Sequence, residues 1–213
     1  MYPVDLSGKR AVVFGVANDR SIAWAVCRVL HQAGARLAIA YQNERLRSRV
    51  DRLVQEMDGV MLVQCDVTSD ADIESAFSQI GQDMGGLDCL VHSVAFAQRE
   101  DLGGDFSNLG REGFQTAMEV SAYSLIPIAR HGAPLMGEDG GSIFGVCNGF
   151  QVLVKAGLLP GLEGVKASLT WNQSHRFECR WTRLLPAPSL TGLVPGGNFL
   201  PAPSAHAEGR LVL

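Results

Sequence analysis

The chain has 213 residues, a formal net charge of -4 and an isoelectric point near 5.7. This length suits one α/β domain, and the acidic balance argues against nucleic acid or an anionic membrane as a partner. The start of the chain is charged and no apolar run approaches the roughly 20 residues of a membrane helix, so we expect neither a signal peptide nor a membrane span. The five cysteines are scattered and form no Cys-x-x-Cys pair, which predicts reduced thiols in a cytoplasmic protein and no metal site.

A glycine turn between a buried strand and a helix is the most informative feature of the sequence. Residues 11–14 form an apolar run, Gly15 follows them, and residues 21–32 have the spacing of an amphipathic helix. An α/β protein uses this order to present backbone N–H groups to a phosphate, because the first turn of a helix carries unpaired N–H groups. Gly15 supplies the tight turn, and Ser21 either caps the helix or donates its hydroxyl to a phosphate. An ordinary strand-to-helix turn is the alternative.

Strand-like and helix-like segments alternate over the first two thirds of the chain. Apolar strands are expected at 11–14, 36–41, 60–65, 87–92 and from 141 onward, and helices at 21–32, 44–56, 71–84 and 111–131. Pro127 is expected to kink the last helix or to mark its last turn. This alternation predicts a doubly wound, Rossmann-type α/β fold with a parallel sheet covered on both faces. We assign residues 1–145 to a dinucleotide-binding domain.

The residues that directly follow the strands are the candidates for a binding site, because a doubly wound fold binds its ligand beyond the carboxyl ends of its strands. Gln42 stands where an Asp or Glu normally holds the adenosine ribose, and its amide does not repel a 2′-phosphate. Asp66 and Val67 offer a carboxylate and an apolar wall to an adenine, although Asp66 is equally interpreted as a turn residue. Ser93 and Val94 are small enough for a ribose and a nicotinamide to approach.

Several of these stretches resemble the enoyl-acyl-carrier-protein reductases, a branch of the short-chain dehydrogenase/reductase superfamily. The most specific are 15–25 (GVANDRSIAWA) and 91–97 (VHSVAFA), joined by 40–44 (AYQNE) and 65–67 (CDV) within a match over about residues 4–144. The resemblance implies NADH-dependent reduction of a trans-2-enoyl thioester carried on acyl carrier protein, in fatty-acid biosynthesis. NADPH is not excluded as the cofactor. The resemblance also implies a homotetramer, although the altered C-terminal third puts that assembly in doubt.

Position by position, the resemblance implies roles for eight residues in cofactor binding. Three would hold the pyrophosphate region, one the adenosine ribose, two the adenine and two the nicotinamide side. In that order, these residues are Gly15, Ser21, Ile22, Gln42, Asp66, Val67, Ser93 and Val94.

The catalytic pair of that family, Tyr-x6-Lys, is incomplete in this chain. None of the three tyrosines lies seven residues before a lysine, and none follows Tyr123. Residues 160–169 resemble the family's lysine-containing stretch with residues missing, which implies that Lys166 is the matching catalytic lysine. Leu159 then stands in place of the tyrosine, and a solvated surface lysine is the alternative for Lys166. We interpret His92 as a packed strand residue rather than an acid or base.

The missing tyrosine leaves three functions open. The chain is an enoyl reductase, another short-chain oxidoreductase, or an NAD-binding protein without catalytic activity.

Residues 146–213 form a divergent segment without clear periodicity. Two Pro-Ala-Pro-Ser stretches, at Pro186 and Pro201, break any long helix, and we expect no readable regular element there. A reading-frame disruption near residue 145, partly restored around Gly164, explains the abrupt change. A tail that folds on a partner is the alternative.

Overall fold

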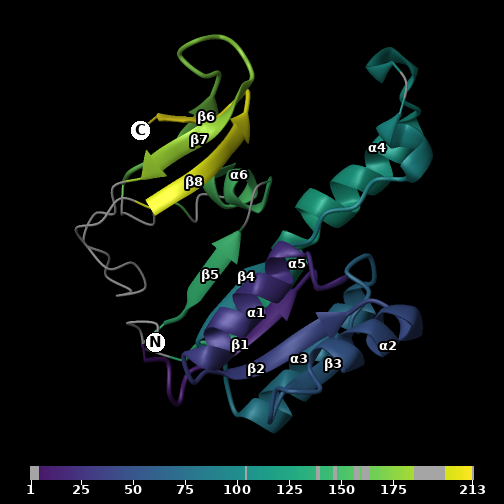
Figure 1. Cartoon of the computed structure of the whole chain (residues 1–213), viewed down its shortest axis with the longest axis vertical. Coiled ribbons are helices and arrows are strands. Elements are labelled where there is room, and N and C mark those ends of the chain that lie inside the picture. Colours follow the sequence, from purple (N-terminus) through teal and green to yellow (C-terminus); the bar gives the residue numbers. More distant parts are fainter. Residues whose placement is uncertain are drawn as a thin grey trace. The chain divides into compact units, whose positions relative to one another are not determined.

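The structure, a computed structural model, describes residues 5–103, 105–137, 140–145, 148–155, 159, 164–184 and 200–212 (Figure 1). The chain divides into two compact units, one over residues 4–150 and one over residues 151–213.

The N-terminal unit is built on a five-stranded parallel sheet in the order β3-β2-β1-β4-β5. Its strands are β1 (Arg10–Phe14), β2 (Arg36–Tyr41), β3 (Met61–Gln64), β4 (Cys89–His92) and β5 (Ser142–Gly145). Phe14 at the end of β1 pairs with Ala40 on one side and with His92 on the other. The predicted doubly wound α/β fold is confirmed, and the strand order reverses between β1 and β4, where such sheets bind their ligands.

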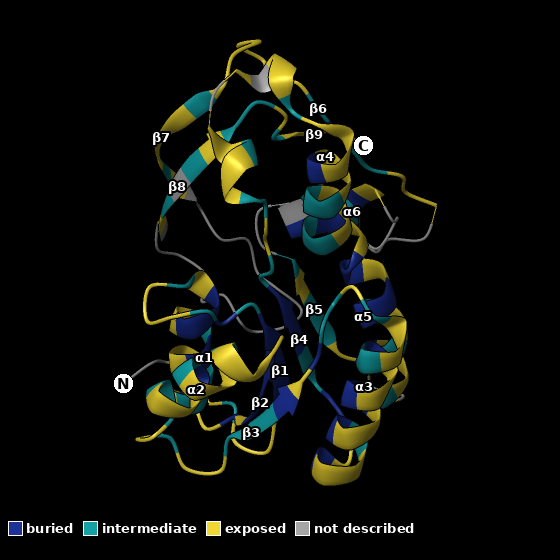
Figure 2. Cartoon of the chain, turned by 90° about the vertical axis from the view of Figure 1, so that its right-hand side faces the viewer, coloured by how far each residue is buried: buried dark blue, intermediate teal, exposed yellow. Residues whose placement is uncertain are grey.

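Helices cover both faces of this sheet (Figures 1 and 2). On one face lie α1 (Ile22–Gln32) and α2 (Glu44–Leu53), and on the other lie α3 (Asp70–Met84) and α5 (Leu125–Gly132). Successive residues of a strand point to opposite faces. Val13 therefore packs in one core cluster with Trp24, whereas Phe14 packs in the other with Ile73. Because both faces are buried, the strands are continuous apolar runs rather than alternating ones.

Residues at the helix ends explain where α2 begins and where α3 begins and ends. The Asn43 side chain accepts a hydrogen bond from the Leu46 N–H at 3.1 Å and starts α2. The Ser69 hydroxyl accepts one from the Asp72 N–H at 3.2 Å and starts α3. Such a cap contributes about 1 kcal/mol to stability. Gly85 ends α3 with a φ of 72°, a left-handed conformation that suits glycine.

The single helix expected over residues 111–131 is interrupted, but not at the proline. It consists of α4 (Arg111–Met118), a π-turn η3 (Glu119–Tyr123) and α5, and the Ser124 N–H donates to the Glu119 carbonyl at 3.1 Å. This bond spans five residues, as in a π-helix. Pro127 does not mark the last turn, because α5 continues to Gly132. It lies in the first turn of α5, directly after the interruption, where a missing N–H breaks no helical bond. The short turns η1 (Arg99–Leu102), η2 (Phe106–Asn108) and η4 (Ala133–Leu135) complete this unit.

The C-terminal unit contains regular elements that the sequence did not indicate. The helix α6 (Asn148–Lys155) leads into it. Strand β6 (Ser168–Thr170) pairs with β9 (Arg210–Val212), and β7 (Glu178–Leu184) pairs with β8 (Leu200–His206), both antiparallel. Pro201 lies within β8, because a two-stranded ribbon leaves one edge of each strand free, where a missing N–H costs nothing. Pro186 lies outside the described residues.

A buried asparagine holds the C-terminal unit together. Asn172 is 7% exposed, and its Nδ2 donates to the carbonyls of His206 at 2.7 Å and Arg176 at 3.0 Å. Its Oδ1 accepts from the Gly209 N–H at 3.1 Å and lies 2.9 Å from His206 Nδ1. A buried amide with all its bonding groups paired stabilises the part of the unit that it joins.

Candidate cofactor site

Four predicted site residues lie at one edge of the N-terminal sheet. In a parallel sheet the carboxyl ends of the strands share an edge. Gly15 follows β1, Gln42 follows β2, Ser93 follows β4, and Asp66 lies two residues beyond the end of β3. The fold therefore brings together residues as far apart in the chain as Gly15 and Ser93.

At this edge the backbone at Gly15 lies close to the backbone at Ser93. Its φ is 105°, and a Cβ atom at this position would lie 2.0 Å from the Ser93 carbonyl oxygen and 3.2 Å from the Val94 nitrogen. The Ser93 N–H donates to the Phe14 carbonyl at 3.1 Å, which ties the two strand ends together. Only glycine fits both the conformation and the space. The two strand ends are therefore close at this turn, and its contact with a dinucleotide stays a prediction.

Ser21 occupies the N-cap position of α1, but its side chain caps no helical N–H group. Its hydroxyl donates to the Asn18 carbonyl at 2.6 Å and accepts from the Ala17 N–H at 3.4 Å. The alternative in which Ser21 is a side-chain cap is therefore wrong, because the hydroxyl stabilises the preceding turn instead. Ile22 opens the helix and is 59% exposed. A contact of Ser21 and Ile22 with a phosphate stays a prediction.

Gln42 and Asp66 are joined by a hydrogen bond of 3.1 Å from Nε2 to Oδ2. The other carboxylate oxygen of Asp66 accepts from the backbone N–H of Thr68 at 3.0 Å and from its hydroxyl at 2.8 Å. Burial opposes ionisation of Asp66, but these hydrogen bonds outweigh burial and lower its pKa. Asp66 is thus an ionised turn residue, and its role beside an adenine stays a prediction. Val67 packs partly buried against the core.

His92, at the end of β4, is 1% exposed. Burial lowers its pKa to about 4, so the imidazole is neutral at pH 7. Its Nε2 lies 2.8 Å from the Ser124 hydroxyl. The structure supports its interpretation as a packed residue with a local hydrogen bond, because the imidazole is buried and its Nε2 is paired with Ser124.

Lys166 is an exposed residue of the C-terminal unit, outside any helix or strand. Leu159 is half-buried, and residues 160–163 lie outside the described residues. The catalytic role of Lys166 stays a prediction, and no tyrosine follows Tyr123 in the sequence.

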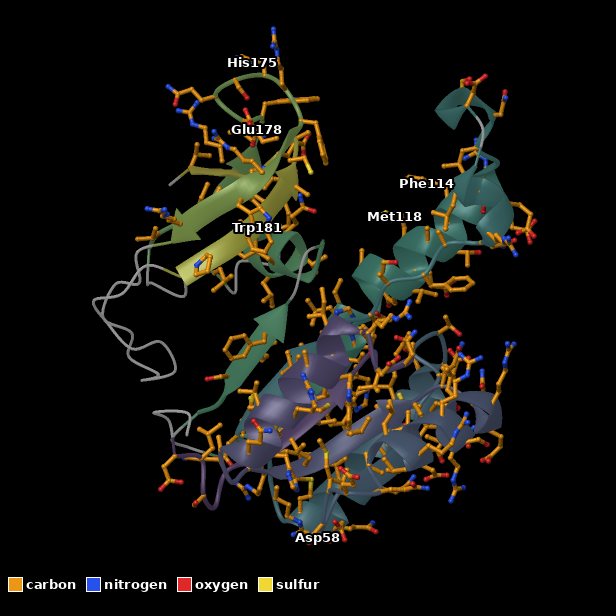
Figure 3. All side chains as sticks on the ribbon, in the orientation of Figure 1. Asp58, Phe114, Met118, His175, Glu178 and Trp181 are labelled. Carbon is orange, nitrogen blue, oxygen red and sulfur yellow. The ribbon has the colours of Figure 1, made fainter. Side chains whose placement is uncertain are left out.

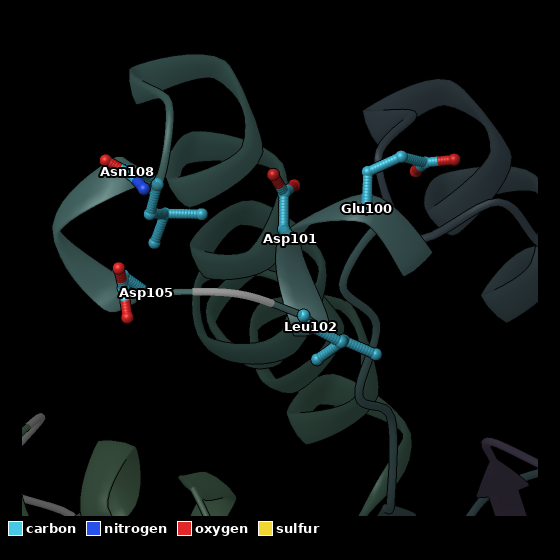
Figure 4. Close-up of a pocket in the computed structure, with 7 residues that line it drawn as sticks. Glu100, Asp101, Leu102, Asp105 and Asn108 are labelled. Atoms are coloured by element: carbon cyan, nitrogen blue, oxygen red, sulfur yellow. The ribbon is translucent and has the colours of Figure 1, made fainter.

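One hollow on the described surface lies away from the predicted cofactor residues. It measures about 450 Å³ and contains none of them (Figure 4). Its lining is Glu100, Asp101, Leu102, Gly103, Asp105, Asn108 and Leu109. The Asp101 carboxylate approaches the first turn of α4 at Gly113, where any larger side chain would collide with it. This hollow is acidic, which disfavours a phosphate-bearing ligand.

The described ranges contain neither a metal-binding cluster nor a membrane-spanning helix. No group of three or more His, Cys, Asp or Glu side chains there is placed to hold a metal ion. None of the helices in the same ranges has the length and apolar character to cross a bilayer.

The sequence and fold match a known family. A family model described as "Enoyl-(Acyl carrier protein) reductase" matches residues 15–151, which is more than half of the chain. The chain belongs to the enoyl-acyl-carrier-protein reductase family. The matched range includes all eight predicted cofactor residues and ends within α6.

Individual relatives of this family share about two fifths of the matched residues. The NADH-dependent enoyl-[acyl-carrier-protein] reductase FabI of Enterococcus faecalis is 43% identical over 138 residues, covering 65% of this chain and 54% of that protein. The NADPH-dependent FabI of Staphylococcus aureus is 40% identical over 174 residues, covering 81% and 67%. The crystal structure of the Aquifex aeolicus NADH enzyme superposes with a TM-score of 0.62 at 40% identity, covering 65% and 55%. The chain thus spans about half the length of the first of these relatives.

The C-terminal part matches a different family model. That model is described as a CobB/CobQ-like glutamine amidotransferase domain and matches residues 127–213. A shifted reading frame would not retain the pattern of a domain family, so this match favours a segment related to a second domain family. The frame disruption and the division at residue 145 stay hypotheses.

One further pattern within that match, not among the predicted site residues, has the form of a nucleophile motif. Gly145-Val-Cys147-Asn-Gly149 stands between the end of β5 and the start of α6. A nucleophile flanked by glycines at a strand-to-helix junction is the signature of a nucleophile elbow. Cys147 itself lies outside the described residues, so the signal is the sequence pattern and its two flanking elements.

Proposed function

We propose that the N-terminal unit binds NADH at the sheet edge where the strands end, next to Gly15 and Ser93. We also propose that the chain derives from an NADH-dependent enoyl-acyl-carrier-protein reductase. The close approach of Gly15 to the Ser93 carbonyl carries this proposal, because a dinucleotide needs such a turn between its phosphates and the sheet. Gln42 and Asp66 offer polar groups to the adenosine half, and Ser93 and Val94 line the nicotinamide half. The names of the relatives supply the substrate, a trans-2-enoyl thioester on acyl carrier protein.

Reduction of such a thioester needs more than the cofactor. NADH, when bound, supplies the hydride, and the protein must stabilise the negative charge that develops on the thioester oxygen. In this chain no tyrosine precedes Lys166 at the required spacing. Loss of one such donor lowers a rate by about 10²–10³. We therefore propose that the chain binds the cofactor but reduces the thioester inefficiently. An NAD-binding protein without catalytic activity is the alternative.

The test is titration of the full chain with NADH and with NADPH, followed by an assay with crotonyl-acyl-carrier-protein. We expect saturable NADH binding and turnover at least about 10²-fold below that of a complete relative. The NADPH titration tests the preference between the two cofactors, because Gln42 does not repel a 2′-phosphate and the exposed ion pairs of Arg47 with Glu44 at 3.5 Å and Asp51 at 3.9 Å are weak. Absence of NADH binding would overturn the proposal, and reduction of a ketone but not of the enoyl thioester would favour another short-chain oxidoreductase.

Assembly and location follow as part of the same proposal. α4 and the turn after it expose apolar side chains, among them Phe114 at 53% and Met118 at 45% (Figure 3). Exposed apolar side chains of this size are typical of a surface that contacts a partner. We propose that this face meets a second copy of the chain in a homotetramer, and that the protein acts in the cytoplasm with acyl carrier protein as its partner.

A second candidate function belongs to the C-terminal segment. The match to a glutamine amidotransferase model and the Gly145-x-Cys147-x-Gly149 pattern favour nucleophilic attack by a thiolate on a glutamine side-chain amide. That reaction would release ammonia and form a thioester, which water then hydrolyses.

Alkylation at neutral pH is expected to single out Cys147. Burial raises the pKa of Cys27 and Cys65 to about 12 and that of Cys89 to about 11, so these thiols stay protonated and unreactive. The exposed Cys179 is the internal control. An activated Cys147 should react with iodoacetamide about tenfold faster than Cys179, and Cys147→Ser should abolish ammonia release from glutamine. Equal alkylation rates without ammonia release would contradict this second function.

A further inference from the structure

The π-turn η3 contacts the backbone segment that leaves β4. The Ser121 hydroxyl accepts a hydrogen bond from the Phe96 N–H at 3.0 Å and donates one to the Phe96 carbonyl at 3.2 Å. One side chain of the turn therefore pairs both backbone groups of a single residue in the segment. Because the two residues are 25 positions apart, this contact is tertiary.

The same turn is anchored to the end of β4 itself. The Ser124 hydroxyl donates to the Val120 carbonyl at 2.7 Å, so it accepts the hydrogen bond from His92 Nε2 at 2.8 Å. The imidazole proton is therefore on Nε2. Ser124 is fully buried and His92 is 1% exposed, so this connection is shielded from water. A hydrogen bond in such surroundings is stronger than one at the surface.

Ser93, Val94 and Ala95 lie between these two anchors. Ser93 in turn lies against Gly15 and donates its N–H to the Phe14 carbonyl at 3.1 Å. The segment is thus held at His92, at Ser93 and at Phe96. A π-turn is rare inside a helix and is frequently found at functional sites.

We propose that the π-turn Glu119–Tyr123 is a clamp that sets the conformation of residues 93–95 for the nicotinamide half of the cofactor, with Ser121 as its positioning residue. The proposal rests on the proposed NADH site of the N-terminal unit. Ser121 contacts Phe96, which follows the predicted cofactor residues in the chain. It acts through the backbone of Phe96, which continues directly from Ser93 and Val94.

The test compares three variants of the full chain. Ser121→Ala removes the hydroxyl, and Ser121→Thr retains it. Ser78→Ala is the matched control, because Ser78 is an exposed serine of α3 whose hydroxyl accepts a hydrogen bond from Gln82 Nε2 at 3.3 Å within the same helix. Hydrogen exchange of the Phe96 amide is measured without ligand. NADH affinity is measured by titration of each variant.

For Ser121→Ala we expect exchange of the Phe96 amide to rise and NADH to bind about five- to tenfold more weakly, as for the loss of one net hydrogen bond. Ser121→Thr should restore both values, and Ser78→Ala should change neither. Unchanged exchange in Ser121→Ala overturns the clamp. Raised exchange with unchanged NADH affinity overturns its positioning role. If the unmodified chain binds no NADH, the proposed site fails, whereas the exchange arm still decides whether the clamp exists.

Discussion

Gly15→Ala is expected to abolish NADH binding and to destabilise the N-terminal unit by about 3 kcal/mol or more. Two costs add at this position. The φ of 105° lies in a region that disfavours a Cβ atom, and that atom would stand 2.0 Å from the Ser93 carbonyl oxygen. Because the Ser93 carbonyl is backbone, it moves only if the end of β4 moves. The displacement would disrupt the surface on which the pyrophosphate and nicotinamide are proposed to lie.

Gly8→Ala is the matched control for this substitution. Gly8 has a φ of 78°, and a Cβ atom there would meet nothing within 4 Å. Its replacement should cost only the conformational part, about 1–2 kcal/mol, and leave NADH binding intact. Urea unfolding and NADH titration of both variants separate the two costs. Equal stability of the two variants, or NADH binding by Gly15→Ala, would show that Ser93 does not constrain this turn.

The stability of the N-terminal unit is expected to fall by on the order of 3 kcal/mol as the pH drops from about 6.5 to about 4. Burial lowers the pKa of His92 from 6.5 to about 4. Between these values the unfolded chain binds a proton that the folded chain does not, so acidification favours unfolding. Above pH 6.5 the stability that depends on neutral His92 is fully present, and below about pH 4 it is completely lost.

His92→Gln isolates this contribution. An amide donor can still bond the Ser124 hydroxyl, and glutamine does not titrate, so the loss of stability between pH 6.5 and 4 should largely disappear. His31→Gln is the control, because His31 bonds the exposed Asp58 carbonyl at 3.2 Å rather than a buried group. Hydrogen bonding from Arg10 lowers the pKa of Asp88 below 3.8, so that carboxylate loses its contribution only at still lower pH. An unchanged acid dependence in His92→Gln would contradict the assignment.

Much of the N-terminal unit could be predicted because its elements are encoded locally. The strand at residues 36–41 has the predicted bounds, since a short apolar run between turn residues is typical of a buried strand in a covered sheet. The other predicted strands differ from the structure by one to a few residues at their ends, where short-range signals compete. Asn43 and Ser69 cap their helices through contacts with residues three positions away, which a sequence displays directly.

The C-terminal unit could not be predicted in the same way. Its ribbon pairs Glu178 with His206 and Leu184 with Leu200, and the decisive partner of His206 is Asn172. These contacts join residues far apart in sequence and carry no apolar period. Pro201 argues locally against a strand. It is tolerated because it lies at a free edge, and that edge arises from the strand pairing and not from the segment itself.

The sequence by itself determined the alternation of strands and helices, the glycine turn at residue 15 and the absence of a tyrosine before Lys166, because each depends on residue type and local spacing alone. Only the tertiary structure decided that Ser121 and Ser124 hold the segment after β4. Both serines lie in a helical stretch whose interruption the sequence placed at Pro127 instead. The physical reason is that their partners, Phe96 and His92, are 25 and 32 residues away and are brought within hydrogen-bonding distance only when the helix packs on the sheet.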